Sequence, residues 1–385
     1  MVLGGQDFAR GGRYRARVHA SRLDETLGGA SARSGVPGAQ AVMMRDGDVL
    51  WSGAYGVTDV ETEAPVTDGT LFCLASVGKL LLATFTLERA ERGLLDLDSP
   101  IASVLGEEIP GTEVVTTRML LAHTAGYPDV YESPEVREMM PPEKPDEVTG
   151  YDPDRPFTWS MLAPGFRTPV DPGEHWAYSN GGYIVLAEVL NRLLGGPAEL
   201  MAAWVGFVGR VERHGLNGDV LTLERSESAR VHLARGHFRR QRAPYADAYA
   251  AHPAAGIPTD LYGMPFGDGL FAGTALGAAR FLDSLFVRGA ILGVPTVEMM
   301  IRTSTQSAAD GPTEPGLDTY GLGTFRVPGP SGVWQGHTGT YGGFSAVAAT
   351  RRADGLTLVV LTNGMTDDVQ PARPVWQELA ATCTG

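Results

Sequence analysis

Strand-like segments stand near both ends of this sequence, and helix-like segments fill the middle. Near each end, two apolar runs flank an Asp-Gly pair, a strong hairpin signal because these residues tolerate the positive φ of a tight turn. The paired runs are 39–44 with 49–55 and 344–350 with 356–361. The sequence therefore predicts an α/β fold in which one antiparallel sheet is built from both ends, with an all-helical lobe inserted between them.

Periodic apolar patterns predict helices in the middle of the chain and at both of its ends, where they would flank the sheet. The expected helices are 14–28, ended by Gly28 and Gly29, then 77–92, 117–122, 183–194, 198–209, 275–286 and 374–382. Further strands are expected at 320–327 and 333–338. We therefore divide the chain into an α/β lobe of residues 13–70 and 275–385 and a helical lobe of residues 71–274.

Ser76 and Lys79 form the most informative short motif in the chain. They are three residues apart at the start of an expected helix, so their side chains would share one face, about 5–6 Å apart at Cβ. A helix start also carries unpaired N–H groups that favour an oxyanion. A desolvated lysine can lose its charge and accept the serine proton. The pair is a candidate nucleophile and base; the alternative is a capping Ser76 beside a solvated Lys79.

Lysine is rare in this chain, and one of its two lysines belongs to that motif. Among 31 basic residues only Lys79 and Lys144 are lysines, and arginine supplies the rest. Arginine stays protonated in proteins, so it cannot replace a lysine that gives up and regains a proton. This usage favours the catalytic interpretation of Lys79, which still requires partners elsewhere in the chain.

Charge and composition argue against several classes of function. The net charge is −14, from 45 acidic and 31 basic residues, which disfavours binding to nucleic acid or to an anionic membrane surface. Cys73 and Cys383 are far apart and predict neither a disulfide framework nor a metal site. The N-terminal residues lack an apolar signal segment, and no run of 18 apolar residues occurs. We therefore expect a cytoplasmic protein without a metal or a cofactor.

Two stretches of the chain show little periodicity. Residues 128–174 are rich in proline and acidic residues, and residues 211–266 hold a basic cluster that includes Arg235 and Arg242. Long irregular segments in an enzyme often line a pocket. The basic cluster is either a solvated helix face paired with nearby acids or a patch for an anionic substrate or acceptor, and the sequence leaves both open.

Several short stretches, in their order and spacing, resemble the serine β-lactamase and penicillin-binding protein superfamily, and most of all its class C branch. They are Ser-Val-Gly-Lys at 76–79, Leu-Leu-Ala-His-Thr-Ala-Gly at 120–126, Tyr-Ser-Asn at 178–180 and His-Thr-Gly at 337–339. Each stretch is weak alone, and the combination is specific. The resemblance covers roughly residues 14–382. It implies a β-lactamase/transpeptidase-like fold, in a group that also includes DD-peptidases, esterases and acyltransferases.

The resemblance also implies roles for individual residues. Ser76 would attack an acyl carbon and form a covalent ester, while Lys79 holds and exchanges the serine proton. Tyr178 would act as the general base, its phenolic pKa lowered by the nearby lysine charge. Asn180 would bind the substrate and brace Lys79. The backbone amides of Ser76 and Thr340 would form the oxyanion hole.

The His-Thr-Gly stretch departs from many members of the superfamily, which have lysine in its first position. His337, followed by Thr338 and Gly339, would line the substrate site from an edge strand. Without that lysine the site lacks a charge that β-lactamases use to hold a carboxylate, so we expect His337 to tune substrate choice; the alternative is a structural hydrogen bond. We expect His123 to be a buried bracket for a loop beside the site and Cys73 to pack in the core.

These residues predict a serine enzyme that forms an acyl-enzyme with an ester, thioester or amide of a small molecule. With water as acceptor it would be an esterase or amidase. With an amine or alcohol as acceptor it would be a transacylase of natural-product biosynthesis. The alternative is a non-catalytic binding or scaffold protein that keeps the fold, against which the joint presence of Ser76, Lys79, Tyr178 and Asn180 argues. The sequence names neither the acyl donor nor the oligomeric state.

Overall fold

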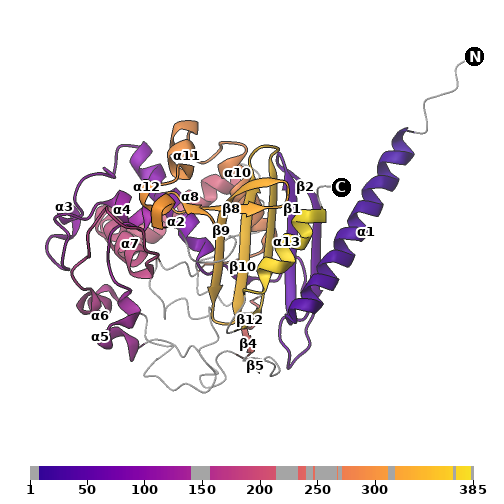
Figure 1. Cartoon of the computed structure of the whole chain (residues 1–385), viewed down its shortest axis with the longest axis horizontal. Coiled ribbons are helices and arrows are strands. Elements are labelled where there is room, and N and C mark those ends of the chain that lie inside the picture. The colour runs from indigo at the N-terminus through magenta and orange to yellow at the C-terminus, as the bar shows by residue number, and fades with distance from the viewer. Residues whose placement is uncertain are drawn as a thin grey trace, which may run out of the picture.

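The computed structural model describes residues 8–139, 157–213, 233–239, 246–247, 267, 271–310, 317–366 and 370–382. Seven strands form one antiparallel sheet in the order β2-β1-β11-β10-β9-β8-β7. They are β1 (Gly38–Arg45), β2 (Asp48–Gly56), β7 (Thr319–Tyr320), β8 (Phe325–Gly329), β9 (Gly332–Tyr341), β10 (Phe344–Arg351) and β11 (Leu356–Thr362). Strands from the two ends of the chain lie side by side (Figure 1), which confirms the predicted sheet.

Both predicted hairpins are present, and their turns use the expected residues. Asp46 and Gly47, between β1 and β2, have φ of 50° and 91°, and Gly355, before β11, has φ of 68°. Left-handed φ values of this kind are easy for glycine and tolerated by aspartate, so the Asp-Gly pairs allow the chain to reverse.

The helices lie on both faces of this sheet and in a separate group beyond one of its edges (Figure 1). The α-helices are α1 (Phe8–Ser34), α2 (Val77–Glu91), α3 (Ala102–Leu105), α4 (Thr117–Ala122), α5 (Pro134–Arg137), α6 (Trp159–Leu162), α7 (Asn180–Leu194), α8 (Pro197–Arg213), α10 (Ala275–Phe286), α11 (Val294–Ile301), α12 (Thr305–Asp310) and α13 (Ala372–Thr382). The short 3-10 turns are η1 (Val130–Glu132) and η2 (Ala163–Gly165). The short strands outside the main sheet are β3 (Phe72–Cys73), β4 (His237–Arg239), β5 (Ala246–Asp247), β6 (Ala272–Gly273) and β12 (Gly364–Thr366).

Each face of the sheet has its own hydrophobic core. The terminal helices α1 and α13 pack on one face, whereas α10 and α2 pack on the other. Successive residues of a strand point to opposite faces, so in β10 Val347 and Ala349 join the core beneath the terminal helices, and Ala346 and Ala348 join the core around α2. The second core continues into the helical region and positions the candidate site.

Two predictions of element boundaries are wrong. Helix α1 continues through Gly28 and Gly29 to Ser34 instead of ending there. A glycine inside a helix costs about 1 kcal/mol, but Leu23 and Leu27 of the same helix are buried against the sheet. Burying one leucine side chain contributes about 1.5–3 kcal/mol, so packing outweighs the local preference.

The segment predicted as one strand at 320–327 forms two strands, β7 and β8. The chain turns between them, where Gly323 has φ of 79°. A Cβ on Gly321 would lie 2.2 Å from the carbonyl oxygen of Met300, so this position accepts only glycine. The close approach to α11 therefore interrupts a pattern that alternates well in the sequence.

Other predictions remain open. The division into two lobes at residues 70 and 275 stays a prediction. Much of the irregular stretches, including Arg240, Arg242 and the side chain of Arg239 in the basic cluster, lies outside the described residues, as does Cys383.

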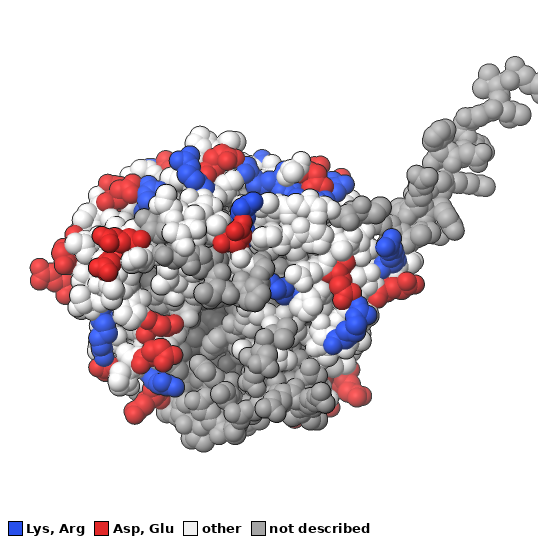
Figure 2. All heavy atoms as spheres, in the orientation of Figure 1, with Lys and Arg blue, Asp and Glu red and all other residues white. Residues whose placement is uncertain are grey.

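Every helix in the described part of the chain is too short or too polar to span a membrane. On the face in Figure 2, acidic side chains gather over the helical part at the left, with basic side chains among them.

Candidate active site

Ser76 is held in place by the turn that opens helix α2. Ala75, just before it, has φ of 47°, a left-handed conformation that costs a non-glycine residue about 1–2 kcal/mol. Leu74 anchors the turn, because its amide donates to the Phe271 carbonyl at 2.7 Å and its own carbonyl accepts from the Val77 amide at 3.1 Å. The strained Ala75 lets the chain pass directly from strand β3 to helix α2, with Ser76 at the junction.

Lys79 lies one turn into α2 and reaches back to the serine. Its Nζ is 3.1 Å from Ser76 Oγ, within hydrogen-bond distance. The lysine side chain is 0% exposed, and its Nζ lies 5.2 Å from the ring centre of Tyr178 and 5.8 Å from that of Tyr183. The prediction of a shared helix face is confirmed, and the alternative of a solvated Lys79 is wrong.

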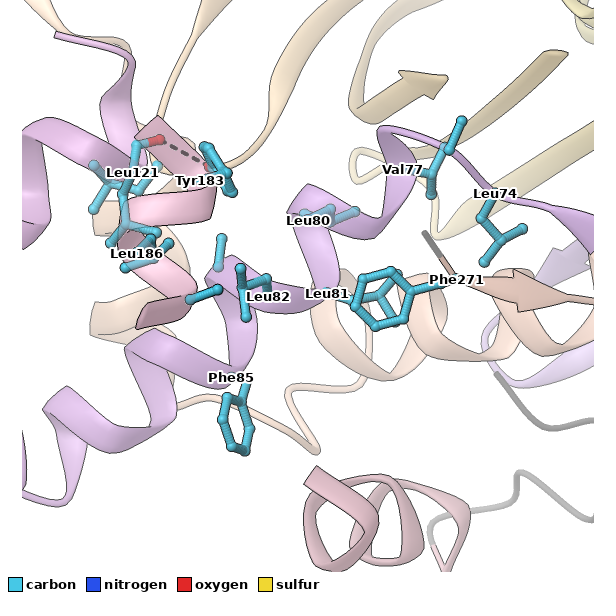
Figure 3. Close-up of a cluster of buried hydrophobic side chains, with 14 of the residues drawn as sticks. Leu74, Val77, Leu80, Leu81, Leu82, Phe85, Leu121, Tyr183, Leu186 and Phe271 are labelled. Carbon is cyan, nitrogen blue, oxygen red and sulfur yellow. Dashed lines mark hydrogen bonds between the residues drawn. The ribbon is translucent and has the colours of Figure 1, made fainter. Parts of the chain in front are cut away.

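Hydrophobic packing fixes the direction of α2. Figure 3 shows Leu80 and Leu82 among the buried side chains that connect this helix to α4 and α7. The dashed line in the same view is the hydrogen bond from Tyr183 Oη to the Leu121 carbonyl, at 3.0 Å. Tyr183 therefore ties α7 to α4 on the side of the site that faces Lys79.

Strand β9 passes against the backbone of the serine. A Cβ on Gly339 would lie 2.5 Å from the Leu74 carbonyl oxygen and 2.9 Å from the Ser76 nitrogen, so only glycine permits this approach. Thr338 is buried and Thr340 half-buried on either side of it. The predicted His-Thr-Gly stretch is thus brought to the serine, with Thr340 next to the point of closest approach.

The strand that carries His337 is an edge strand over only part of its length. Its first half, up to Gly336, pairs with β8 on one side and β10 on the other, and the β8 register ends there. Beyond that point the described residues pair β9 with β10 alone. The prediction of an edge strand is therefore wrong for the strand as a whole and holds for the segment from His337 to Tyr341.

His337 is buried and neutral. It is 1% exposed, its Nδ1 lies 2.5 Å from the Thr338 carbonyl oxygen, and its Nε2 lies 3.2 Å from Tyr320 Oη. A carbonyl only accepts, so Nδ1 carries the proton and Nε2 accepts from the tyrosine. Burial lowers the pKa of His337 to about 3, and the Lys79 charge adds to that effect. The residue therefore supplies no positive charge at neutral pH.

Tyr178 and Asn180 lie where the chain enters α7. Tyr178 is 36% exposed, and its ring stacks on Phe325 of β8 with centroids 6.4 Å apart. Ser179 caps the helix by accepting from the Gly182 amide at 3.1 Å, which places half-buried Asn180 at the first helical position. The structure therefore brings Tyr178 close to Lys79, as predicted, and the bracing of Lys79 by Asn180 stays a prediction.

Sequence reasoning missed Tyr183 and Tyr320, which line the buried side of the site. Their hydroxyl oxygens are 3.5 Å apart, and burial raises the pKa of both phenols. Tyr183 lies in an apolar helical pattern and Tyr320 in an alternating strand pattern, so each is typical of a core residue. No local signal distinguishes them, because their relation to Lys79 and His337 arises only on folding.

Comparison with known protein sequences finds a family model and several relatives that match this chain. A family model described as Beta-lactamase matches residues 23–381. Esterase EstB of Burkholderia gladioli is 39% identical over 112 residues, which are 28% of this chain and 29% of the esterase. Penicillin-binding protein 4* of Bacillus subtilis is 26% identical over 188 residues, 46% of this chain and 37% of that protein. The matched segments span about a third of the length of these relatives.

Solved structures resemble this chain over nearly its whole length. The D-amino acid amidase from Ochrobactrum anthropi, complexed with L-phenylalanine amide, has a TM-score of 0.72 at 21% identity, covering 95% of this chain and 97% of the amidase. An octameric penicillin-binding protein homologue from Pyrococcus abyssi has a TM-score of 0.73 at 21% identity, covering 94% and 76%. At these identities the likeness shows the shared fold, which confirms the predicted β-lactamase/transpeptidase-like class.

Proposed function

The chain belongs to the beta-lactamase family, and from this we propose that it is a serine hydrolase that cleaves a small ester or amide through an acyl-enzyme on Ser76. One observation carries the proposal: Lys79 Nζ lies 3.1 Å from Ser76 Oγ, on a lysine with no exposed surface. A nucleophile and a base within hydrogen-bond reach, at the start of a helix, are the arrangement that acyl transfer needs.

In the first half of the proposed reaction, the pair of Tyr178 and Lys79 takes the proton of Ser76 while Oγ bonds to the acyl carbon. The carbonyl oxygen becomes an oxyanion, which the amides of Ser76 and Thr340 stabilise. No described residue accepts from the Ser76 amide, so this donor is available. The bond to the leaving group then breaks, and the leaving oxygen or nitrogen takes its proton through Tyr178.

In the second half, a water molecule gives one proton to the Tyr178 and Lys79 pair and its oxygen to the acyl carbon. The ester bond to Ser76 breaks, Oγ regains a proton, and the free acid leaves. Tyr178 suits this step because it is partly exposed while its ring lies 5.2 Å from Lys79 Nζ. Each half of the reaction therefore returns Tyr178 and Lys79 to their starting protonation.

Two kinds of observation support a small uncharged ester or amide as the donor. The relatives include an esterase, and the structural neighbours include an amidase complexed with L-phenylalanine amide. His337 also places a neutral ring where many members of the superfamily have lysine, so this position offers no cation to a substrate carboxylate. We expect His337→Lys to favour donors with a carboxylate near the scissile bond.

Transfer of the acyl group to an amine or alcohol, as in a class C-like transacylase, is the finer form of the proposal. A bound, well-oriented acceptor can reach effective concentrations of about 10⁵ M or more, enough to compete with water. The test is partitioning: the acyl-enzyme is formed first, and free acid and transfer product are measured as acceptor is added. Free acid at a constant rate and yield would limit the activity to hydrolysis.

The hydrolase proposal itself is tested by turnover of p-nitrophenyl esters of increasing acyl length. We expect Lys79→Arg to lose nearly as much kcat/KM as Lys79→Ala, because arginine does not release its proton. Arg210→Lys on α8 is a matched control for a change between the same two basic residues. An active Lys79→Arg enzyme would refute the proton-transfer role. A wild type that never turns over would instead favour a binding or scaffold protein.

A further inference from the structure

We propose that His123 is the positioning residue that holds the Tyr178 ring beside Lys79, a role that rests on the proposed function. His123 follows helix α4, more than fifty residues before Tyr178 in the sequence. It contacts the tyrosine in two independent ways, through the backbone on either side of it and through its ring. The sequence interpretation of a loop bracket covers only the first of these contacts.

His123 is hydrogen-bonded to the backbone on both sides of Tyr178. The Ala177 amide donates to the His123 carbonyl at 3.0 Å, and the Ser179 amide donates to His123 Nδ1 at 3.2 Å. The residue before and the residue after the tyrosine are therefore bound to one amino acid. Two hydrogen bonds that bracket a single residue restrict the φ and ψ angles that aim its side chain.

The imidazole also lies against the tyrosine ring. The two ring centroids are 4.3 Å apart with an interplanar angle of 34°. The imidazole is also close to the rings of Tyr320, at 4.8 Å, and Tyr183, at 5.0 Å between centroids. The ring of His123 therefore contacts Tyr178 and both buried tyrosines, and this packing restricts the movement of the Tyr178 ring beside Lys79.

The protonation state of His123 agrees with this role. Nδ1 accepts from the Ser179 amide, so the single proton of the neutral ring is on Nε2. Burial first, and then the charge of Lys79, lower the pKa of His123 well below its usual range. A protonated ring would present a donor to the Ser179 amide and lose that hydrogen bond. No described atom accepts from the buried Nε2. The rings of Tyr183 and Tyr320 lie within 5.0 Å of the imidazole, centroid to centroid, a range in which an N–H group can make a weak contact with an aromatic ring.

The backbone conformation of His123 and the hydrogen bonds of the residues after it support this contact. His123 has φ of 57° and ψ of 37°, the left-handed conformation that ends α4. The chain then continues alongside the segment that leads to Tyr178: the Gly173 amide donates to the Thr124 carbonyl at 2.7 Å, and the Val170 amide to that of Gly126 at 2.9 Å. A Cβ on Gly126 would lie 2.1 Å from the Val170 oxygen, so the two segments touch.

Two substitutions distinguish the contribution of the His123 side chain from that of its backbone conformation. Glycine and asparagine both tolerate the left-handed conformation, so His123→Gly and His123→Asn keep the turn. Glycine removes the acceptor and the ring, whereas asparagine restores an acceptor oxygen. We expect kcat on a p-nitrophenyl ester to fall about 100-fold in His123→Gly and about 10-fold in His123→Asn, with KM within about threefold, as misplacement of a catalytic group by about 1 Å predicts.

A double-mutant cycle distinguishes positioning from general structural damage. If His123 acts through Tyr178, then His123→Gly should cost little further kcat in the Tyr178→Phe background. Additive losses would overturn the proposal, as would wild-type kcat in His123→Gly. Leu379→Ala, at a buried residue of α13, is the control: it should lower stability and leave kcat within about threefold. If Ser76→Ala or Tyr178→Phe is fully active, the proposed function itself is wrong. The inference, which rests on that function, is then wrong as well.

Discussion

The two walls of the candidate site are held in different ways. The helical wall, residues 123–126 with 170–180, is fixed by hydrogen bonds between loops and by the ring of one histidine. The strand wall, residues 336–341, is fixed by its register with β10. The helical wall therefore depends on hydrogen bonds of the loop main chain together with one side chain, that of His123, whereas the strand wall depends on its main chain alone. The two walls should respond differently to substitution, and three predictions test this.

The largest effect is expected in the helical wall, where a side chain performs the proposed chemistry. Tyr178→Phe keeps the ring that contacts His123 and Phe325 and removes only the hydroxyl. A lost general base lowers kcat by about 10²–10⁴-fold. Tyr127→Phe is the matched control, because the Tyr127 hydroxyl donates to the Pro110 carbonyl, away from Ser76. Equal activity in the two variants would remove Tyr178 from the mechanism.

A smaller effect is expected in the strand wall, from the addition of a single carbon. Gly339→Ala places a Cβ against the Leu74 oxygen and the Ser76 nitrogen, so β9 must move away from the serine. Losing one oxyanion donor costs about 10²–10³-fold in kcat, and we expect a loss in this range with the far-ultraviolet circular dichroism unchanged. Gly28→Ala, where an added Cβ meets nothing within 4 Å, should leave kcat unchanged. Full activity in Gly339→Ala would contradict main-chain control of this wall.

The smallest effect is expected on the free energy of unfolding, through His337 in the strand wall. The pKa of His337 is about 3 in the folded protein and about 6.5 when unfolded, so between these values the unfolded chain binds more protons. The free energy of unfolding should therefore fall as the pH drops below about 6.5, with a contribution from His337 of about 2 kcal/mol by pH 5.

Denaturant titrations at pH 7 and pH 5 measure this loss. We expect His337→Asn to reduce it, because asparagine does not take up a proton in this pH range. The loss should not vanish in His337→Asn, because the pKa of His123 is lowered as well. Identical losses in the wild type and His337→Asn would contradict the burial of a neutral His337.

The parts of the fold that local chemistry determines could be predicted from the sequence. The Asp-Gly hairpins and the helix after Ser76 follow from turn preferences and apolar periodicity. The end of α1 at Ser34 could not be predicted, because burial of Leu23 and Leu27 overrides the helix-breaking tendency of Gly28 and Gly29. The break between β7 and β8 was missed for a similar reason, since it depends on contact with α11.

Prediction of the candidate site from the sequence was limited in the same way. The spacing of Ser76 and Lys79 alone predicted their contact, and Tyr178 was located through the resemblance of its motif. The left-handed conformation of Ala75 and the contacts of His123 with the tyrosines could not be predicted. They join segments that are distant in sequence, and neither residue type signals its partner.

The covalent state of the protein after reaction with p-nitrophenyl acetate tests the central claim most directly. The account predicts one acetyl group per chain, which peptide mass spectrometry places on Ser76, and it predicts that Ser76→Ala neither acquires the acetyl group nor turns over the ester. The acetylated enzyme should lose the group at least as fast as the ester is turned over in the steady state, since it is an intermediate. An acetyl group on another residue, with Ser76→Ala still active, would contradict the account.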